Sequence, residues 1–253
     1  MRRLGWLLAW LTLLMGGPSQ ADCTADSGSQ RHHLLELYTS EGCSSCPPAD
    51  RYLSGLRHQP RLWPLAFHVD DWDHLGWPDR FAQPAFGQRQ KALSNRQGRD
   101  FVYTPQFRLD GLDWRPDRAA APWPFPPEPA GRLTLRSQWR APATLVVSGT
   151  WHGGPGHLFL AVHESGLESE VRAGENAGRR LHHDDVVRQL IGPRKIDRGS
   201  FRQTLKLAPD NTLANLAVTA FITGPDESSV IQALGVPVCG CAETACVRVP
   251  KRP

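Results

Sequence analysis

The chain has 253 residues, of which 21% are charged, and its formal net charge is +4. A balance this mild, without a run of like charge, argues against a nucleic-acid-binding protein. About 230 residues follow the leader described next, enough for one large domain or two smaller ones.

Residues 1–21 have the pattern of a signal peptide. Arg2 and Arg3 precede an apolar stretch from Leu4 to Met15, and Ser19-Gln20-Ala21 offers small residues for cleavage. The apolar stretch is shorter than the roughly 20 residues that span a bilayer, and no later segment approaches that length. Loss of the leader removes two arginines and no acid, so the mature charge is +2. We expect secretion into an oxidising space, where disulfides persist.

Strand and helix signals alternate in residues 22–115. Nearly continuous apolar runs predict buried strands, and paired prolines suit the first turn of a helix. The expected elements are strands over residues 33–39 and 63–69 and helices over residues 47–56 and 84–97. The strand–helix–strand order predicts a right-handed βαβ unit.

Cys43 and Cys46 stand where the first strand meets the first helix. Two cysteines with this spacing in a βαβ context form a redox motif. The positive end of the helix dipole favours the thiolate of Cys43. Cys43 is therefore the candidate nucleophile toward a substrate disulfide, and Cys46 the thiol that resolves the mixed disulfide. The alternative is a small structural disulfide at the start of the helix.

Three further residues are candidates for the same site. Pro105 interrupts a strand pattern over residues 101–111, which predicts either an edge strand or a cis-proline loop that places Thr104 against the sulfurs. Such a loop would offer backbone groups to an extended substrate strand. Glu36 is an acid in the apolar strand that leads to Cys43. It is either a buried acceptor for the Cys46 proton or a structural acid with a partner.

The second half is patterned for strands. Residues 116–130 are rich in proline and predict a stiff linker or a surface-docked segment. Residues 131–238 predict a β-sandwich-like domain with strands over residues 133–139, 143–149, 157–164, 201–207, 215–223 and 230–238. One short helix is expected from His183 to Leu190, with Asp184 and Asp185 in its exposed first turn.

The other four cysteines are Cys23 and, in the tail 239–253, Cys239, Cys241 and Cys246. If Cys43 pairs with Cys46, these four allow three connectivities. Two structural disulfides are expected in an oxidising space, one joining the tail to the region of Cys23. The alternative is a soft-metal site, because closely spaced thiolates suit Cu(I) or Zn. The acids of residues 70–74 are interpreted as turn formers and helix caps.

Several segments together resemble a known family. They are residues 36–50, which hold Cys43-Ser44-Ser45-Cys46, residues 67–73, residues 103–106 with Thr104-Pro105, and Gly174-Glu175-Asn176-Ala177-Gly178-Arg179. They resemble domain of unknown function 1223, an uncharacterised family of secreted bacterial proteins, over most of residues 33 to about 235. The resemblance implies a thioredoxin-like fold, a site at the cysteine and Thr-Pro motifs and, together with the signal-peptide pattern, export to the bacterial periplasm. The stretch after Gly111 departs from a thioredoxin-like unit, which would continue with a strand and a closing helix.

The sequence therefore predicts an α/β thioredoxin-like domain followed by an all-β, β-sandwich-like domain. The predicted function is thiol–disulfide exchange with protein thiols or disulfides, without a cofactor. One alternative is a copper-binding or copper-delivery protein that uses Cys43 and Cys46. Another is a non-enzymatic binding module on a thioredoxin-like scaffold, which a fully buried Cys43 sulfur would favour.

Overall fold

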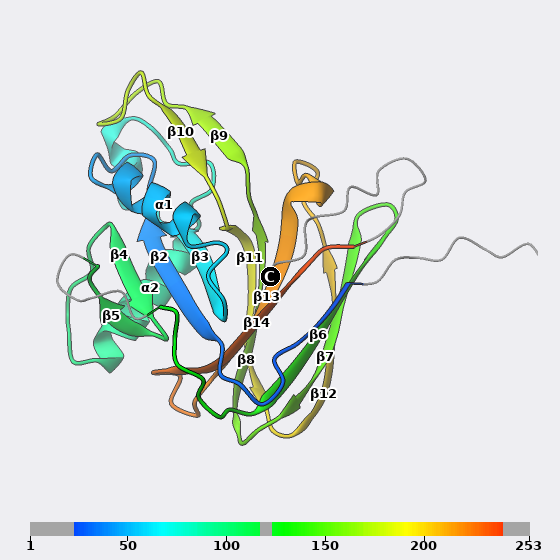
Figure 1. Cartoon of the computed structure of the whole chain (residues 1–253). Coiled ribbons are helices and arrows are strands. Elements are labelled where there is room, and N and C mark those ends of the chain that lie inside the picture. Colours follow the sequence, from blue (N-terminus) through cyan, green and yellow to red (C-terminus); the bar gives the residue numbers. More distant parts are fainter. Residues whose placement is uncertain (1–22, 117–122, 240–253) are drawn as a thin grey trace, which may run out of the picture.

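The computed structural model describes residues 23–116 and 123–239, so the predicted signal peptide, Cys241 and Cys246 lie outside the described residues. In chain order (Figure 1) the elements are β1 (Cys23–Asp26), β2 (His33–Thr39), α1 (Cys46–Gly55), β3 (Leu62–His68), η1 (Asp73–Leu75), α2 (Pro84–Arg96), β4 (Gln106–Leu109), β5 (Leu112–Trp114), β6 (Arg132–Arg140), β7 (Thr144–His152), β8 (Gly156–Glu164), β9 (Leu167–Glu170), β10 (Arg180–His183), β11 (Val186–Ile196), β12 (Gly199–Lys206), η2 (Leu213–Asn215), β13 (Leu216–Thr223) and β14 (Val230–Pro237). No helix within these described ranges is both long and apolar enough to cross a membrane.

Strands from both halves of the chain form one large mixed sheet. Its order is β14-β13-β8-β11-β3-β2-β4-β5, with β3 parallel to both β2 and β11 and the other neighbours antiparallel. A second sheet has the order β1-β6-β7-β12, and β9 pairs with β10 alone. The large sheet thus joins the site-bearing strands β2 and β3 directly to the C-terminal strands.

The expected fold class is wrong. The protein is mostly β, α1 and α2 are the two α-helices of the described residues, and the arrangement is not an α/β thioredoxin fold. The physical reason is the pairing of Ala66 on β3 with Val186 on β11, which continues the sheet into the second half. A βαβ pattern is a local signal and does not say which strand pairs beyond it. The limits assigned to the two domains and the linker stay predictions.

The helix expected at His183–Leu190 is also wrong, whereas the six predicted strands of the second half are confirmed as β6, β7, β8, β12, β13 and β14. Residues from Val186 onward form β11, which lies between β8 and β3. Two successive β-branched valines fit a pleated, buried surface. Asp184 and Asp185 are buried rather than exposed. Sheet pairing on both sides overrides the helix-start signal of the two aspartates.

Side-chain alternation in β2 divides the core between two faces of the large sheet. Leu35 and Leu37 pack with residues of α1, and Leu34 and Tyr38 pack with residues of α2. The four-stranded sheet packs on the same face of the large sheet as α1, but over β8 instead of β2. Alternate residues of β8, Leu158, Leu160 and Val162, pack with it, whereas Phe159 and Ala161 pack on the α2 side. Figure 1 shows α1 and α2 on opposite sides of β2 and β3. A β2 residue therefore reaches one helix or the other.

A disulfide joins the two ends of the described chain. Cys23 on β1 is bonded to Cys239, just beyond β14, with 5.4 Å between their Cα atoms. The bond spans a sequence separation of 216 residues. It ties β1, an edge strand of the four-stranded sheet, to the end of β14, an edge strand of the eight-stranded sheet.

Candidate functional site

Cys43 and Cys46 form a disulfide at the amino terminus of α1, with their Cα atoms 5.4 Å apart. A tight turn holds them, because the backbone N–H of Cys46 donates to the Cys43 carbonyl at 3.2 Å. Prolines occupy the first helical positions, where no intrahelical N–H is needed. Cys43 is 1% exposed and Cys46 is 0% exposed. Burial of Cys43 is the property expected if the protein is a non-enzymatic binding module.

Thr104 and Pro105 lie beside the strand that leads to the disulfide. Gln106 pairs with Tyr38, so the preceding residue, Pro105, comes next to Thr39 at the end of β2. The Thr104–Pro105 peptide bond is cis. Trp72 links this loop to the cysteines, since its indole Nε1 donates to Thr104 Oγ1 at 2.7 Å.

Gly42 allows Trp72 to pack against the turn that carries the cysteines. A Cβ atom at position 42 would come within 2.9 Å of Trp72 Cβ and 3.3 Å of its carbonyl oxygen. Any side chain there would displace the tryptophan or the turn. Glycine before Cys43 is therefore required by close packing.

The structure does not bring Glu36 to the disulfide. Glu36 alternates with Leu35 and Leu37, so it lies on the α2 face of the large sheet, opposite the face that carries α1. Its carboxylate accepts from Arg89 of α2 at 2.9 Å and from the Tyr38 hydroxyl at 3.3 Å. Glu36 has the contacts of a structural acid with a partner.

Asp50 is the acid that the sequence reasoning missed. It follows Cys46 by four residues on α1, a spacing that places two side chains on one face of a helix. It is buried, and burial raises its pKa although His68 and His183 act in the opposite direction. The i,i+4 spacing from Cys46 was readable in the sequence once the helix was predicted.

A buried polar cluster surrounds the base of α1. Glu41 accepts from the Trp77 indole at 2.8 Å and lies 3.2 Å from His183 Nε2. Asp79 contacts His68 Nδ1 at 2.6 Å and accepts the Glu41 backbone N–H at 2.8 Å. The rings of His68 and His183 are 5.0 Å apart at their centroids. The cluster thus joins the turn before Cys43 to β3 and β10.

Opposite charges set the protonation of the central pair of this cluster. Burial works against the Asp79 carboxylate, but His68 and backbone N–H donors hold the pKa of Asp79 below its ordinary value. Burial likewise works against a charged His68, but Asp79 raises the pKa of that imidazole above its ordinary value. The two shifts together favour an ionised carboxylate beside an imidazolium.

Residues 174–178, between β9 and β10, cover the cysteine turn, and we call them the cover segment. The Asn176 amide donates to the carbonyl oxygens of Glu41 at 2.8 Å and Cys43 at 2.9 Å. The carboxylate of Glu175 accepts the backbone N–H of Ser44 at 2.9 Å. Asn176 is buried, whereas Glu175 is exposed. Because more than 130 residues separate these partners, no local pattern could predict the contact.

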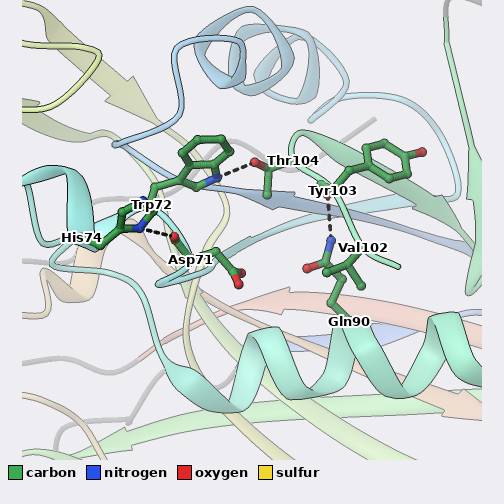
Figure 2. Close-up of a pocket in the computed structure, with 7 residues that line it drawn as sticks. All are labelled: Asp71, Trp72, His74, Gln90, Val102, Tyr103 and Thr104. Carbon is green, nitrogen blue, oxygen red and sulfur yellow. Dashed lines mark hydrogen bonds between the residues drawn. The ribbon is translucent and has the colours of Figure 1, made fainter. Parts of the chain in front are cut away.

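A pocket of about 200 Å³ lies next to Trp72 and Thr104. Its lining, drawn in Figure 2, consists of Asp71, Trp72, His74, Gln90, Val102, Tyr103 and Thr104. Trp72 therefore contributes both to the pocket and to the packing around Gly42. No group of three His, Cys, Asp or Glu side chains suited to hold a metal ion occurs within residues 23–116 and 123–239.

Two solved structures are similar in fold. The crystal structure of a protein from Agrobacterium tumefaciens matches with a TM-score of 0.58 and 22% identity, over 81% of this chain and 93% of that one. HBP35 of Porphyromonas gingivalis matches with a TM-score of 0.60 and 17% identity, over 88% of this chain and 81% of that one. At these identities the likeness concerns the fold alone.

No similar protein was found among curated proteins. The family model described as "Protein of unknown function (DUF1223)" matches residues 34–223, a range that includes Cys43, Cys46, Thr104, Pro105 and the cover segment. The chain therefore belongs to this family of unknown function.

Proposed function

We propose that this protein exchanges disulfides with the thiols of a partner protein through Cys43 and Cys46. The observation that carries the proposal is the position of the bond: a disulfide at the amino terminus of α1, with the buried acid Asp50 one turn along the same helix. The signal-peptide pattern of residues 1–21 adds secretion into an oxidising compartment to the proposal.

The exchange begins when a partner thiolate attacks Cys43 Sγ. The Cys43–Cys46 bond breaks and its electron pair stays on Cys46, which leaves as a thiolate near the positive end of α1. Asp50 lies four residues along the same helix and would give that thiolate a proton from its protonated form, which burial favours by raising its pKa. A second partner thiolate then attacks the partner's sulfur in the mixed disulfide, and Cys43 leaves. The partner is oxidised by two electrons and this protein is reduced by two.

Attack on Cys43 requires its cover to move, because the residue is 1% exposed. Asn176 holds the carbonyl of Cys43, and Trp72 packs against Gly42. Glu175 adds an exposed hydrogen bond to Ser44 on the same turn. Displacement of the cover segment by a partner would uncover Cys43 while Cys46, the first residue of α1, stays buried. This asymmetry matches a nucleophile and a resolving thiol.

The burial of Cys43 also favours a second candidate function. In that function the bond is a permanent part of the scaffold, and the protein binds partners without exchange. The two candidates differ in one measurable property, the reactivity of Cys43 in the folded protein.

The test compares Cys46→Ser, which leaves Cys43 free, with Cys43→Ser, which leaves Cys46 free. Each folded variant is mixed with a peptide carrying an activated mixed disulfide, and the coupled product is followed by mass spectrometry. We expect rapid coupling for Cys46→Ser and slow coupling for Cys43→Ser, because only the Cys43 side lies under a removable cover. A matched experiment in urea gives the rate for the unfolded chain.

If both variants couple only at the rate of global unfolding, the disulfide is structural and the second candidate stands. Circular dichroism of both variants before mixing establishes that the comparison is between folded proteins. Wild-type protein treated in the same way reports any coupling at cysteines other than Cys43 and Cys46.

A further inference from the structure

We propose that the pocket lined by Trp72, Asp71 and Gln90 binds a basic side chain, lysine or arginine, of the partner protein near its reacting thiol. This inference rests on the proposed function, since it names the substrate feature that the exchange site would recognise. Three observations carry it. The buried amide oxygen of Gln90 has no hydrogen-bond partner, the partly exposed carboxylate of Asp71 lines the pocket, and Trp72 belongs both to the pocket and to the packing against the turn that carries the cysteines.

The orphaned acceptor is the amide oxygen of Gln90. Gln90 is 0% exposed, and its Oε1 atom has no hydrogen-bond partner. Its Nε2 donates to the Tyr103 carbonyl at 2.9 Å and to Gln106 Oε1 at 2.8 Å. A buried polar atom left without a partner costs about 1–3 kcal/mol, so a ligand that donates to it gains affinity.

A chain of hydrogen bonds establishes which atom of Gln90 faces the pocket. Gln106 Nε2 donates to the carboxylate Asp113 Oδ1 at 2.8 Å, so the oxygen of Gln106 must face Gln90. The nitrogen of Gln90 must then face Gln106 and Tyr103, because both offer only oxygen there. The remaining oxygen of Gln90 points to the side on which Asp71 lies, as Figure 2 shows.

Asp71 supplies the charge. Its side chain is 42% exposed, and its cationic neighbour Lys91 lies 4.0 Å away and is itself 60% exposed. A pair at that distance and exposure is worth little, so Asp71 is open to a better-placed cation. Asp70 and Asp73 on the same loop add negative charge. The other titratable residues of the lining are His74, whose Nδ1 is 2.9 Å from the Asp71 carbonyl oxygen, and Tyr103, whose hydroxyl donates to Asp113 Oδ1 at 2.7 Å.

The walls suit the aliphatic stem of a basic residue. Trp72 and Val102 provide apolar surface, whereas the Tyr103 ring points away and contributes its backbone (Figure 2). An indole also attracts a cation through its π-system. A volume of about 200 Å³ is smaller than the roughly 300–1,000 Å³ of drug-sized ligand sites and fits one side chain.

The pocket and the disulfide share Trp72. Its indole bonds to Thr104, and its Cβ abuts Gly42, the residue before Cys43. A basic side chain seated in the pocket would therefore hold the partner's neighbouring residues beside the cysteine turn. Its binding would also act on the tryptophan that packs against that turn.

The binding test needs no cysteine in the ligand. Blocked tripeptides with central lysine, arginine, norleucine or glutamate are titrated into the oxidised wild-type protein. Binding is followed by NMR at the indole N–H of Trp72, which Trp72→Phe assigns. The variants are Asp71→Asn and, as a matched exposed acid outside the pocket, Asp197→Asn.

We expect lysine and arginine peptides to bind about tenfold more tightly than norleucine, as one well-placed charge contact provides. Asp71→Asn should remove that preference and Asp197→Asn should keep it. Equal binding of lysine and norleucine, or an unchanged preference in Asp71→Asn, overturns the inference.

A kinetic arm separates this inference from the proposed function. The coupling of Cys46→Ser is repeated with activated peptides that carry lysine or norleucine beside the cysteine. A lysine preference that disappears in Asp71→Asn supports the inference. Coupling at equal rates for both peptides overturns it and leaves the exchange function intact. Peptide binding without any coupling overturns the exchange function alone.

Discussion

The two disulfides of the described chain differ in almost everything except the 5.4 Å between their Cα atoms. Cys43–Cys46 spans three positions and is buried, whereas Cys23–Cys239 spans 216 and is half-buried at both ends. A bond that closes a long loop removes far more freedom from the unfolded chain than one that closes a short loop. The short bond lies instead where a helix start, a buried acid and a cover segment meet. We interpret the long bond as a stabilising link and the short bond as the proposed site of disulfide exchange.

Removal of each bond should separate these roles most strongly. Cys23→Ser/Cys239→Ser should lower the free energy of unfolding by about 5 kcal/mol, and Cys43→Ser/Cys46→Ser by about 2 kcal/mol, because chain entropy scales with loop length. Urea unfolding of both double variants and the wild type measures the difference. Equal losses would contradict the assignment of the long bond to stability.

The cover segment offers the next largest effect. Asn176→Ala should cost about 1–3 kcal/mol, because the buried carbonyls of Glu41 and Cys43 lose their donor. In the Cys46→Ser background it should also speed alkylation of Cys43 about tenfold or more, since local opening becomes easier. Glu175→Gln is the matched control on the same segment, and its exposed bond to Ser44 should leave stability unchanged. Faster alkylation in both variants would show that Asn176 is not the specific restraint.

The pH dependence around the short bond provides the smallest and most local test. Burial raises the pKa of Asp50 above its ordinary value of 3.8. Its favourable contribution is therefore complete below that ordinary value and is lost as pH rises through the raised pKa. Asp50→Asn should gain stability relative to wild type as pH rises through this window, measured by urea unfolding of the oxidised proteins.

Asp79→Asn is the control of opposite sign in the same cluster. His68 and backbone donors lower the pKa of Asp79, so its stabilising contribution exists above its ordinary pKa and is lost as pH falls. The Asp79→Asn variant should be less stable than wild type near neutral pH, and the difference should shrink in acid. Parallel pH profiles for the two variants would contradict the assigned shifts.

Much of the local structure could be read from the sequence. The bounds of α2, Pro84–Arg96, differ by one residue from the expected 84–97, and β2 matches residues 33–39. Apolar period, prolines at helix starts and terminal glycines are short-range signals that act within a few residues. The strand at Val186–Ile196 was missed for the converse reason, because its state depends on β8 and β3 on either side.

The candidate site was predictable in part. Cys43, Cys46, Thr104 and Pro105 were found from motif and spacing, and the structure places the two pairs at the same end of β2. Alternation in β2 placed Glu36 on the opposite face from its leucine neighbours. Which face carries α1 could not be read, because that depends on how the helix crosses the sheet. The same limit hid Asn176, whose partners are 133 and 135 residues away.

The cysteine pair, its place before a helix and the strand pattern could be predicted, because they follow from spacing and period along a few turns of chain. The shared mixed sheet of the two halves and the pairing of Cys23 with Cys239 became known from the folded chain. The tertiary structure also decided that Asp50 and not Glu36 lies on the disulfide's side of the sheet. Each of these depends on contacts between segments far apart in sequence, where loop closure and burial choose among arrangements that local patterns leave equal.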